Sequence, residues 1–273
     1  MYQVFKIPKR SGGFRIIEAP DPELKLTQQR LINPISKQYR VSCFAHAFQP
    51  YKNIVTMAGS HVGREYVGCL DITDFFPSIT LILFTSHARL VPYNPDRPDI
   101  AELVNPCFHD FGDGKGERLP QGAPTSPLLS NIFMHNFDWI MAHSAGRLDC
   151  NYSRYADDLV FSGNTRSHIK VLFKIAGYYL GKMKLKINQE KTKIMHRSGR
   201  QLVCGIIVNK KINLPRKFKK NLRAEIFQQK GEQVSDKTQG RVAFSKMVLE
   251  NKKDFRSCSE ILNTIKLQKQ LMK

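Results

Sequence analysis

The chain has 273 residues, of which 41% are hydrophobic, so it is long enough to bury a sizeable core in one large domain or in several closely packed subdomains. Its 43 Lys and Arg residues against 23 Asp and Glu give a formal net charge of +20, which favours a polyanionic partner over a merely basic, solvated surface. No apolar run approaches the roughly 18–20 residues of a membrane span and no signal peptide is recognisable, so we expect no membrane partner. The six cysteines form no Cys-x-x-Cys pair, which argues against a zinc site and favours a reducing, cytoplasmic location.

The first forty residues predict a hairpin and then a helix. Alternating apolar residues over 2–7 and 14–17 flank Gly12-Gly13, whose freedom at positive φ suits a tight turn. Helical spacing of apolar residues follows over 23–40. The chain therefore opens with a small sheet that carries basic residues around its turn.

The middle of the chain mixes strand and helix patterns. The apolar run over 66–70 predicts a strand that ends at Asp71. A stretch rich in Pro and Gly, 92–120, precedes a loop and then one predicted helix over 126–141.

The second half of the chain predicts a tight acidic turn and a change of composition. Two short strands flank Tyr155-Ala156-Asp157-Asp158, and a helix is expected over 169–183. The segment 202–208 has the pattern of a buried strand. Beyond residue 210 the chain becomes strongly basic, and the spacing after Pro215 predicts a helix with one packed and one basic face. We expect a small helical subdomain there, suited to gripping a duplex backbone.

The chemistry depends on Asp71, Asp157 and Asp158. Carboxylates at strand ends can share one site and hold two divalent cations roughly 3.5–4 Å apart, as phosphoryl transfer to a primer terminus requires. Hard oxygen ligands suit Mg²⁺, so we expect two Mg²⁺ ions at these acids. A purely structural Asp-Asp turn is the alternative interpretation, because Asp is common in turns. The combined pattern predicts a nucleotide polymerase.

Five segments resemble the motifs of reverse transcriptases, in the order in which that family carries them. Segment 70–79 resembles the first catalytic motif, and 119–127 resembles the loop that meets the incoming nucleotide. Tyr155-Ala156-Asp157-Asp158 resembles the second catalytic motif, and Asn188-x-x-Lys191-Thr192 and Cys204-Gly205 follow. The resemblance implies an RNA-directed DNA polymerase that adds dNTPs on an RNA template with two Mg²⁺ ions.

The same resemblance implies an α+β, right-hand polymerase fold with an antiparallel palm sheet, fingers and a small helical thumb. The fingers would comprise residues 1–62 and 83–125. The palm would comprise residues 63–82 and 126–209, and the basic helical thumb residues 210–273.

Four side chains match positions that meet the incoming nucleotide in reverse transcriptases. Phe76 matches the aromatic steric gate that selects dNTPs, with an ordinary core Phe as the alternative. Gln121 is expected to hydrogen-bond either the sugar of the nucleotide or a neighbouring backbone group, and Arg15 is expected to hold the triphosphate oxygens. Lys191 matches a lysine that can protonate the leaving pyrophosphate, with a surface lysine as the alternative.

Further residues are expected to bind metal, primer or RNA. The Ile72 carbonyl is a further metal ligand beside the three acids, and Gly205 belongs to the primer grip. The thumb residues expected to bind RNA are Arg216, Lys217, Lys219 and Lys220.

Within the family, the chain resembles bacterial retron-type enzymes. The resemblance rests on segments 74–79 and 154–159, and on Ala58-x-x-His61-Val62-Gly63. Met57 stands where the retron signature has Asn, and Cys204 stands where its Val-Thr-Gly element has Thr. His61 is open to two interpretations, an RNA contact or a hydrogen-bonded, partly buried histidine.

Retron similarity implies specific partners: a cognate structured noncoding RNA that serves as template and primer, its branched cDNA product (msDNA), and an effector toxin protein in antiphage defence. Group II intron-like or other defence-associated reverse transcriptases remain an alternative within the same chemistry. A catalytically idle RNA-binding scaffold is the alternative from another class, and it would be expected to lack one of the metal carboxylates. Template-independent or protein-primed synthesis also stays open.

Overall fold

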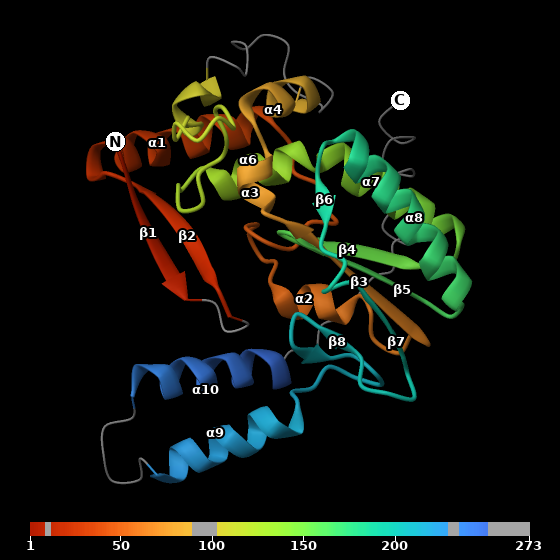
Figure 1. Cartoon of the computed structure of the whole chain (residues 1–273). Helices are drawn as coiled ribbons and strands as arrows, with labels where there is room; N and C mark the ends of the chain where they lie inside the picture. The colour runs from red at the N-terminus through yellow and green to blue at the C-terminus, as the bar shows by residue number, and fades with distance from the viewer. Residues whose placement is uncertain (9–11, 89–102, 229–234, 251–273) are drawn as a thin grey trace.

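The computed structural model describes residues 1–8, 12–88, 103–228 and 235–250 (Figure 1). Its centre is an antiparallel sheet in the order β4-β5-β3-β6, with β7 also pairing with β3. The strands are β3 (Tyr66–Thr73), β4 (Asn151–Tyr155), β5 (Asp158–Gly163), β6 (Lys186–Ile187) and β7 (Lys193–His196). Because β3 pairs with three other strands, it forms the middle of the palm.

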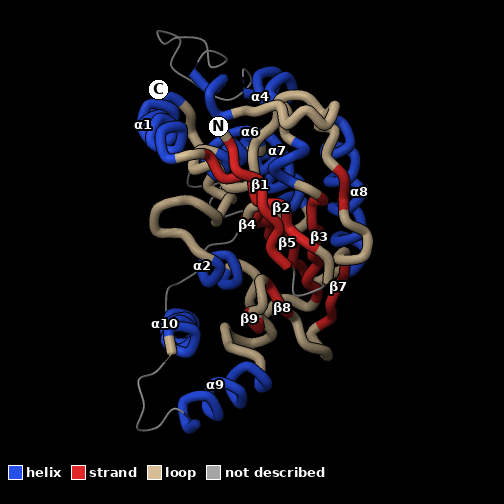
Figure 2. The backbone as a smooth tube through the Cα atoms, turned by 60° about the vertical axis from the view of Figure 1, so that its left-hand side comes forward, coloured by secondary structure: helices blue, strands red, loops and turns tan. Residues whose placement is uncertain are grey.

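Two long helices cover one face of this sheet. Helix α7 (His135–Arg147) packs on β4, and α8 (Arg166–Lys182) packs on β5 and β3. A Cβ on Gly68 would lie 2.5 Å from Ile169 Cγ2, so the glycine allows α8 to approach the central strand closely. Helix α2 (Ile54–Gly59) lies on the other side of the strands from α8 (Figure 2).

The fingers are built around the N-terminal hairpin. β1 (Tyr2–Pro8) and β2 (Phe14–Pro20) pair antiparallel, as predicted, and the turn residues 9–11 lie outside the described residues. The predicted helix over 23–40 is α1 (Pro22–Gln38), which begins with Asp21 as N-cap, its Oδ1 accepting the Leu24 N–H at 2.9 Å. Further short helices among the described residues are α3 (Phe75–Ser78), α4 (Leu81–Ala88), η1 (Asn105–Cys107) and α6 (Ser126–Phe133).

The thumb follows a small hairpin at the foot of the palm. β8 (Leu202–Val203) and β9 (Ile206–Ile207) pair, and helices α9 (Arg216–Gln228) and α10 (Asp236–Leu249) pack on each other through Phe218 and Phe244, whose ring centroids are 5.7 Å apart. A second buried cluster joins thumb and palm and includes Val55, Met57, Val67, Val160, Val203, Ile206, Leu214 and Val248. This core crosses the predicted boundary near residue 210, so thumb and palm share apolar packing.

Three expectations about elements were wrong. The segment 202–208 is a hairpin rather than one buried strand, because Cys204 (φ 46°) and Gly205 (φ 81°) form a two-residue turn at positive φ. The predicted helix over 126–141 is two helices, broken at Met134, whose ψ of −1° turns the chain out of regular helix. The strand expected to end at Asp71 continues to Thr73. In the part of the chain that the structure describes, no helix is both long and apolar enough to cross a membrane.

Candidate active site

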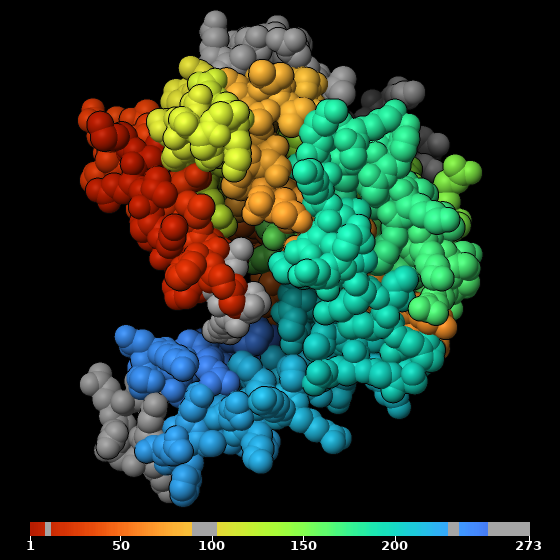
Figure 3. All heavy atoms as spheres, in the orientation of Figure 1, coloured from red at the N-terminus to blue at the C-terminus, as the bar shows by residue number. Residues whose placement is uncertain are grey.

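The three acids lie on adjoining segments of the palm sheet. Asp157 follows Ala156 (φ 53°) in the tight turn between β4 and β5, and Asp158 begins β5. In the β3–β5 ladder, Asp71 is directly opposite Asp158, and the Ile72 N–H donates to the Asp157 carbonyl at 3.1 Å. Residues that are 86 or 87 positions apart in the sequence are therefore neighbours, as the shared-site prediction requires. The hollow between the N-terminal hairpin, the palm and the thumb is visible in the space-filling view (Figure 3).

The acids repel one another in a partly desolvated setting. Burial, together with the smaller effects of the Asp157 and Asp71 charges, raises the pKa of Asp158 to about 6. Burial also raises the pKa of Asp157, and Asp71 adds to the effect, whereas Lys191 and Arg15 oppose it. The cluster carries more negative charge than its surroundings compensate, which is the condition under which carboxylates bind cations.

Lys191 forms an ion pair with one of the three acids. Its Nζ lies 2.9 and 3.0 Å from the two Asp71 carboxylate oxygens, and this hydrogen bond raises the lysine pKa. The Asn188 N–H donates to the Asp71 carbonyl at 2.8 Å, so the loop that carries Lys191 is anchored to β3. Lys191 therefore contacts Asp71, a predicted metal ligand, which argues against the alternative interpretation of an unpaired surface lysine.

The donor set fits divalent metal, although the described residues do not form a closed cage. No group of three or more His, Cys, Asp or Glu side chains within these residues is arranged closely enough to hold an ion. The available donors are carboxylate oxygens, which Mg²⁺ prefers, and the Lys191 ammonium stands in for positive charge at Asp71. Asp71, Asp157 and Asp158, with the Ile72 carbonyl beside them, are the residues that would hold metal.

A buried ion pair beneath the acidic turn was not anticipated from the sequence. Arg154 and Asp138 are both fully buried, and the guanidinium donates to the two carboxylate oxygens at 2.8 Å each. The Tyr152 hydroxyl donates to the same carboxylate at 2.7 Å. Arg154 Nη1 also donates to the Ala156 carbonyl at 3.1 Å, so the pair holds the turn that presents Asp157. The sequence offers only a weak signal for this pair, namely an Arg within a predicted strand and an Asp within a predicted helix. The contact between them forms only when helix and strand pack, so the sequence pattern does not show it.

Phe76 follows the β3 strand that carries Asp71 and keeps part of its ring exposed. It is half-buried on α3, 5.5 Å from the ring of Phe75 and 6.4 Å from that of Phe48, measured between centroids. Phe75 is buried in the core, as expected. The Phe48 ring lies 6.5 Å from that of Tyr155 in the acidic turn, which connects the gate position to the catalytic strand pair.

Arg15 and Gln121 come from different segments of the fingers. Arg15 is exposed on β2, and its charge reaches Asp157, whose pKa it lowers against the dominant effect of burial. Gln121 is half-buried, and its main chain is bonded to Glu18 in both directions. Both residues predicted to contact the nucleotide are thus held on or against the N-terminal hairpin.

The two residues that depart from the retron signature contact each other. Cys204 Sγ lies 3.7 Å from Met57 Sδ and 3.9 Å from Asp158 Oδ2. Gly205 forms the turn with Cys204, so this hairpin is adjacent to the acids, as a primer grip would be. In the sequence, Met57 and Cys204 are two separate differences from the retron signature. In the fold, their side chains pack against each other.

The remaining predicted residues divide between core and surface. His61 is fully buried, with Nδ1 2.7 Å from Ser162 Oγ and Nε2 2.7 Å from Ser153 Oγ, so an RNA contact through His61 is wrong. Arg216, Lys217 and Lys220 are exposed on α9, whereas Lys219 is half-buried, with its Nζ 3.1 Å from Asn213 Oδ1. The thumb basic residues lie away from the palm strands that carry the acids (Figure 1).

Comparison with known proteins gives this fold and site a family. Residues 7–235 match the model of the family described as "Reverse transcriptase (RNA-dependent DNA polymerase)", and the chain belongs to that family. Telomerase from Candida albicans has a similar fold, with a TM-score of 0.55 at 10% identity over 90% of this chain and 54% of that one. The right-hand polymerase fold with its antiparallel palm sheet is confirmed.

Within the family the chain is a member of the retron reverse transcriptases. It is 36% identical to the retron Mx65 reverse transcriptase of Myxococcus xanthus, over 84% of this chain and 56% of that protein. It is 32% identical to the retron Ec83 reverse transcriptase of Escherichia coli, over 86% of this chain and 78% of that protein. The chain therefore spans little more than half of the Mx65 protein and about three quarters of the Ec83 protein.

Proposed function

We propose that this chain is an RNA-directed DNA polymerase of a retron, which adds dNTPs to a primer terminus on an RNA template. The observation that carries the proposal is the placement of Asp71 opposite Asp158, with Asp157 in the adjoining turn. The three acids form a partly buried, negatively charged cluster at the edge of the palm sheet. When bound there, two Mg²⁺ ions would activate the primer hydroxyl and neutralise the triphosphate. The presence of all three acids weighs against an idle scaffold.

The protein side chains then bind and orient the nucleotide. Arg15 faces the triphosphate from the fingers hairpin, and the Gln121 loop meets the sugar. The half-exposed ring of Phe76 excludes a ribose 2′-hydroxyl by steric contact. Lys191 holds a proton on Nζ, next to Asp71, that can pass to the departing pyrophosphate.

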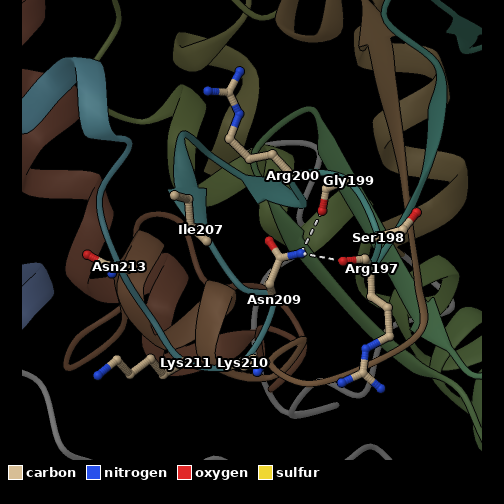
Figure 4. Close-up of a pocket in the computed structure, with 9 residues that line it drawn as sticks. All are labelled: Arg197, Ser198, Gly199, Arg200, Ile207, Asn209, Lys210, Lys211 and Asn213. Carbon is tan, nitrogen blue, oxygen red and sulfur yellow. Dashed lines mark hydrogen bonds between the residues drawn. The ribbon is translucent and has the colours of Figure 1, made fainter.

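We further propose that a structured noncoding RNA is both template and primer and that the basic surface of the thumb binds it. An open pocket of about 500 Å³ between the β7–β8 loop and the start of the thumb extends this surface (Figure 4). The charged ends of Arg197, Arg200 and Lys211 point away from one another around it, which suits an extended phosphate backbone better than one small anion. Asn209 Nδ2 fixes the loop by donating to the carbonyls of Arg197 and Gly199 at 3.0 and 2.7 Å.

The finer biological setting is part of the same proposal. The product would be branched msDNA, and the enzyme would act beside an effector toxin protein in antiphage defence. The described cysteines Cys43, Cys69, Cys107, Cys150 and Cys204 are all free thiols, which supports a reducing, cytoplasmic location.

The test combines product sequencing with a loss of one metal ligand. Nucleic acid copurifying with the wild-type protein should contain short single-stranded DNA joined to RNA through a 2′–5′ bond. Asp157→Asn should abolish primer extension with Mg²⁺, because one ligand charge is lost, whereas Asp236→Asn, an exposed acid on α10, should not. A wild-type protein inactive on every primed RNA template would refute the polymerase assignment, and an unbranched cDNA would refute the retron product.

A further inference from the structure

Glu18 connects the fingers hairpin to the nucleotide loop across 103 residues of sequence. It lies on β2, and only 5% of the residue is exposed. Its Oε2 accepts the Gln121 N–H at 2.9 Å, and its own N–H donates to the Gln121 carbonyl at 2.9 Å. The main chain of Gln121 is therefore fixed from both sides by a single residue.

The second carboxylate oxygen of Glu18 is also engaged. Oε1 lies 3.4 Å from Arg118 Nη2, and the Arg118 guanidinium donates to Asp113 at 2.7 and 3.0 Å. Arg118 is itself buried, and its main chain pairs with His109 through two bonds of 3.1 Å. A buried carboxylate without partners is unfavourable, and here both oxygens of Glu18 have one: Arg118 faces Oε1, and the Gln121 N–H donates to Oε2.

The approach of the loop to β2 leaves no space for a side chain at the next position. Gly122 has φ +145°, and a Cβ there would lie 2.8 Å from the Glu18 carbonyl oxygen. A glycine is needed for both reasons, and the contact is as close as two main chains allow. Hairpin and loop therefore form one unit.

We propose that Glu18 is a positioning residue that fixes the Gln121 loop to the fingers hairpin, so that Arg15 and Gln121 meet the incoming dNTP together. The inference rests on the proposed polymerase function. Arg15 is on the same strand as Glu18 and on its opposite face, and its charge already reaches Asp157. Strand β2 thus carries one nucleotide contact and holds the segment that carries the other.

Glu18→Ala tests the proposal through the dNTP Michaelis constant. Loss of a charge-assisted, buried acceptor should raise the KM for dNTP by about tenfold or more, with kcat and primer–template affinity changed by less than about threefold. Glu18→Gln keeps a neutral acceptor, so its KM should rise less, by about threefold. Glu23→Ala, which removes an exposed acid on α1, is the control and should leave all three quantities unchanged.

Amide hydrogen exchange supplies a readout that does not depend on activity. The Gln121 amide should exchange faster in Glu18→Ala than in the wild type, because its acceptor is gone, and Glu18→Gln should retain most of the protection. An unchanged dNTP KM in a folded Glu18→Ala protein overturns the proposal. The proposal is also overturned if kcat and primer–template affinity fall by the same factor by which the dNTP KM rises. If Glu18→Ala does not fold, Glu18→Gln decides the question by the same KM criterion. Failure of the proposed function itself would instead appear as no dNTP incorporation by the wild type.

Discussion

At the scale of single residues, His61 shows how a signature position serves the fold. Its ring bridges Ser153 on β4 and Ser162 on β5, so it ties together the two strands that flank the acidic turn. Burial, with a smaller effect from the charge of Arg64, lowers the pKa of His61 to about 3. The imidazole is therefore neutral in the folded protein at physiological pH.

The pH dependence of stability should report this burial. The unfolded pKa of His61, near 6.5, exceeds the folded value, so the unfolded state takes up the proton and stability falls as pH drops from about 6.5 towards 3. The loss is about 1.4 kcal/mol per pH unit for each such histidine, and His46, with its pKa also lowered to about 3 by burial, adds a second. Denaturant unfolding at several pH values should show a shallower slope for His61→Asn and an unchanged slope for His143→Asn, an exposed histidine. Equal slopes for His61→Asn and wild type would contradict the assignment.

At the scale of elements, the acidic turn depends on α7 as well as on its own strands. Asp138 on α7 is the counter-ion of Arg154 on β4, and Arg154 in turn holds the Ala156 carbonyl. Neither side chain reaches solvent, so the pair cannot exchange its partner for water. Helix and turn are thereby coupled through a single guanidinium.

Asp138→Asn should be strongly destabilising, because it leaves the Arg154 charge buried without a counter-ion. We expect a loss of about 3–5 kcal/mol in the free energy of unfolding, measured with denaturant. Asp149→Asn is the matched control: Asp149 is 79% exposed and 3.6 Å from Arg64, so its loss should cost less than about 1 kcal/mol. A similar cost for both variants would show that burial does not set the strength of the Arg154 pair.

The elements also show how far the sequence predicts the site. Strands β3, β4 and β5 and helices α1 and α8 have clear periodicity, and the acids lie at strand ends or in a turn, so their convergence could be expected. The β8–β9 hairpin could not, because Cys204 adopts positive φ in a position where Gly, Asn or Asp is usual. The contacts of Glu18 with Gln121 and of Met57 with Cys204 join distant segments, and no local pattern encodes them.

At the scale of the whole molecule, a strongly positive net charge is combined with a local group of three acids, Asp71, Asp157 and Asp158, in the palm. The net charge of +20 exists beside a cluster in which burial first, and the charges of neighbouring acids second, raise the pKa values of Asp157 and Asp158. A polyanion attracted by the exterior would be repelled at the cluster until cations are bound there. RNA binding and metal binding are therefore expected to act on different surfaces.

The salt dependence of RNA affinity can separate these surfaces. Lys217 and Lys220 are exposed on α9, whereas Lys219 already has Asn213 as a partner, so the first two are expected to contribute most of the phosphate contact made by this turn of helix. Replacing both with Ala should reduce the slope of log K against log salt by about 1.4–1.8, since each phosphate contact contributes about 0.7–0.9. Fluorescence anisotropy of a labelled RNA stem-loop across a salt series measures the slope.

The matched control for the thumb is a pair of exposed lysines that also lie about one helical turn apart, on another helix. Lys170 and Lys174 are exposed on α8, on the side of the palm sheet opposite α2, and replacing both removes the same charge. If the thumb binds the RNA backbone, the α8 variant should keep a slope within about 0.3 of the wild type. Salt screens the interaction between the RNA and exposed charges that do not touch it, so the loss of two distant charges changes the slope little. Equal reductions of the slope in both variants would mean that RNA affinity depends on the total charge of the protein. An unchanged slope in the α9 variant would place the RNA-binding surface elsewhere. The pocket lined by Arg200 and Lys211 would then be the next region to test.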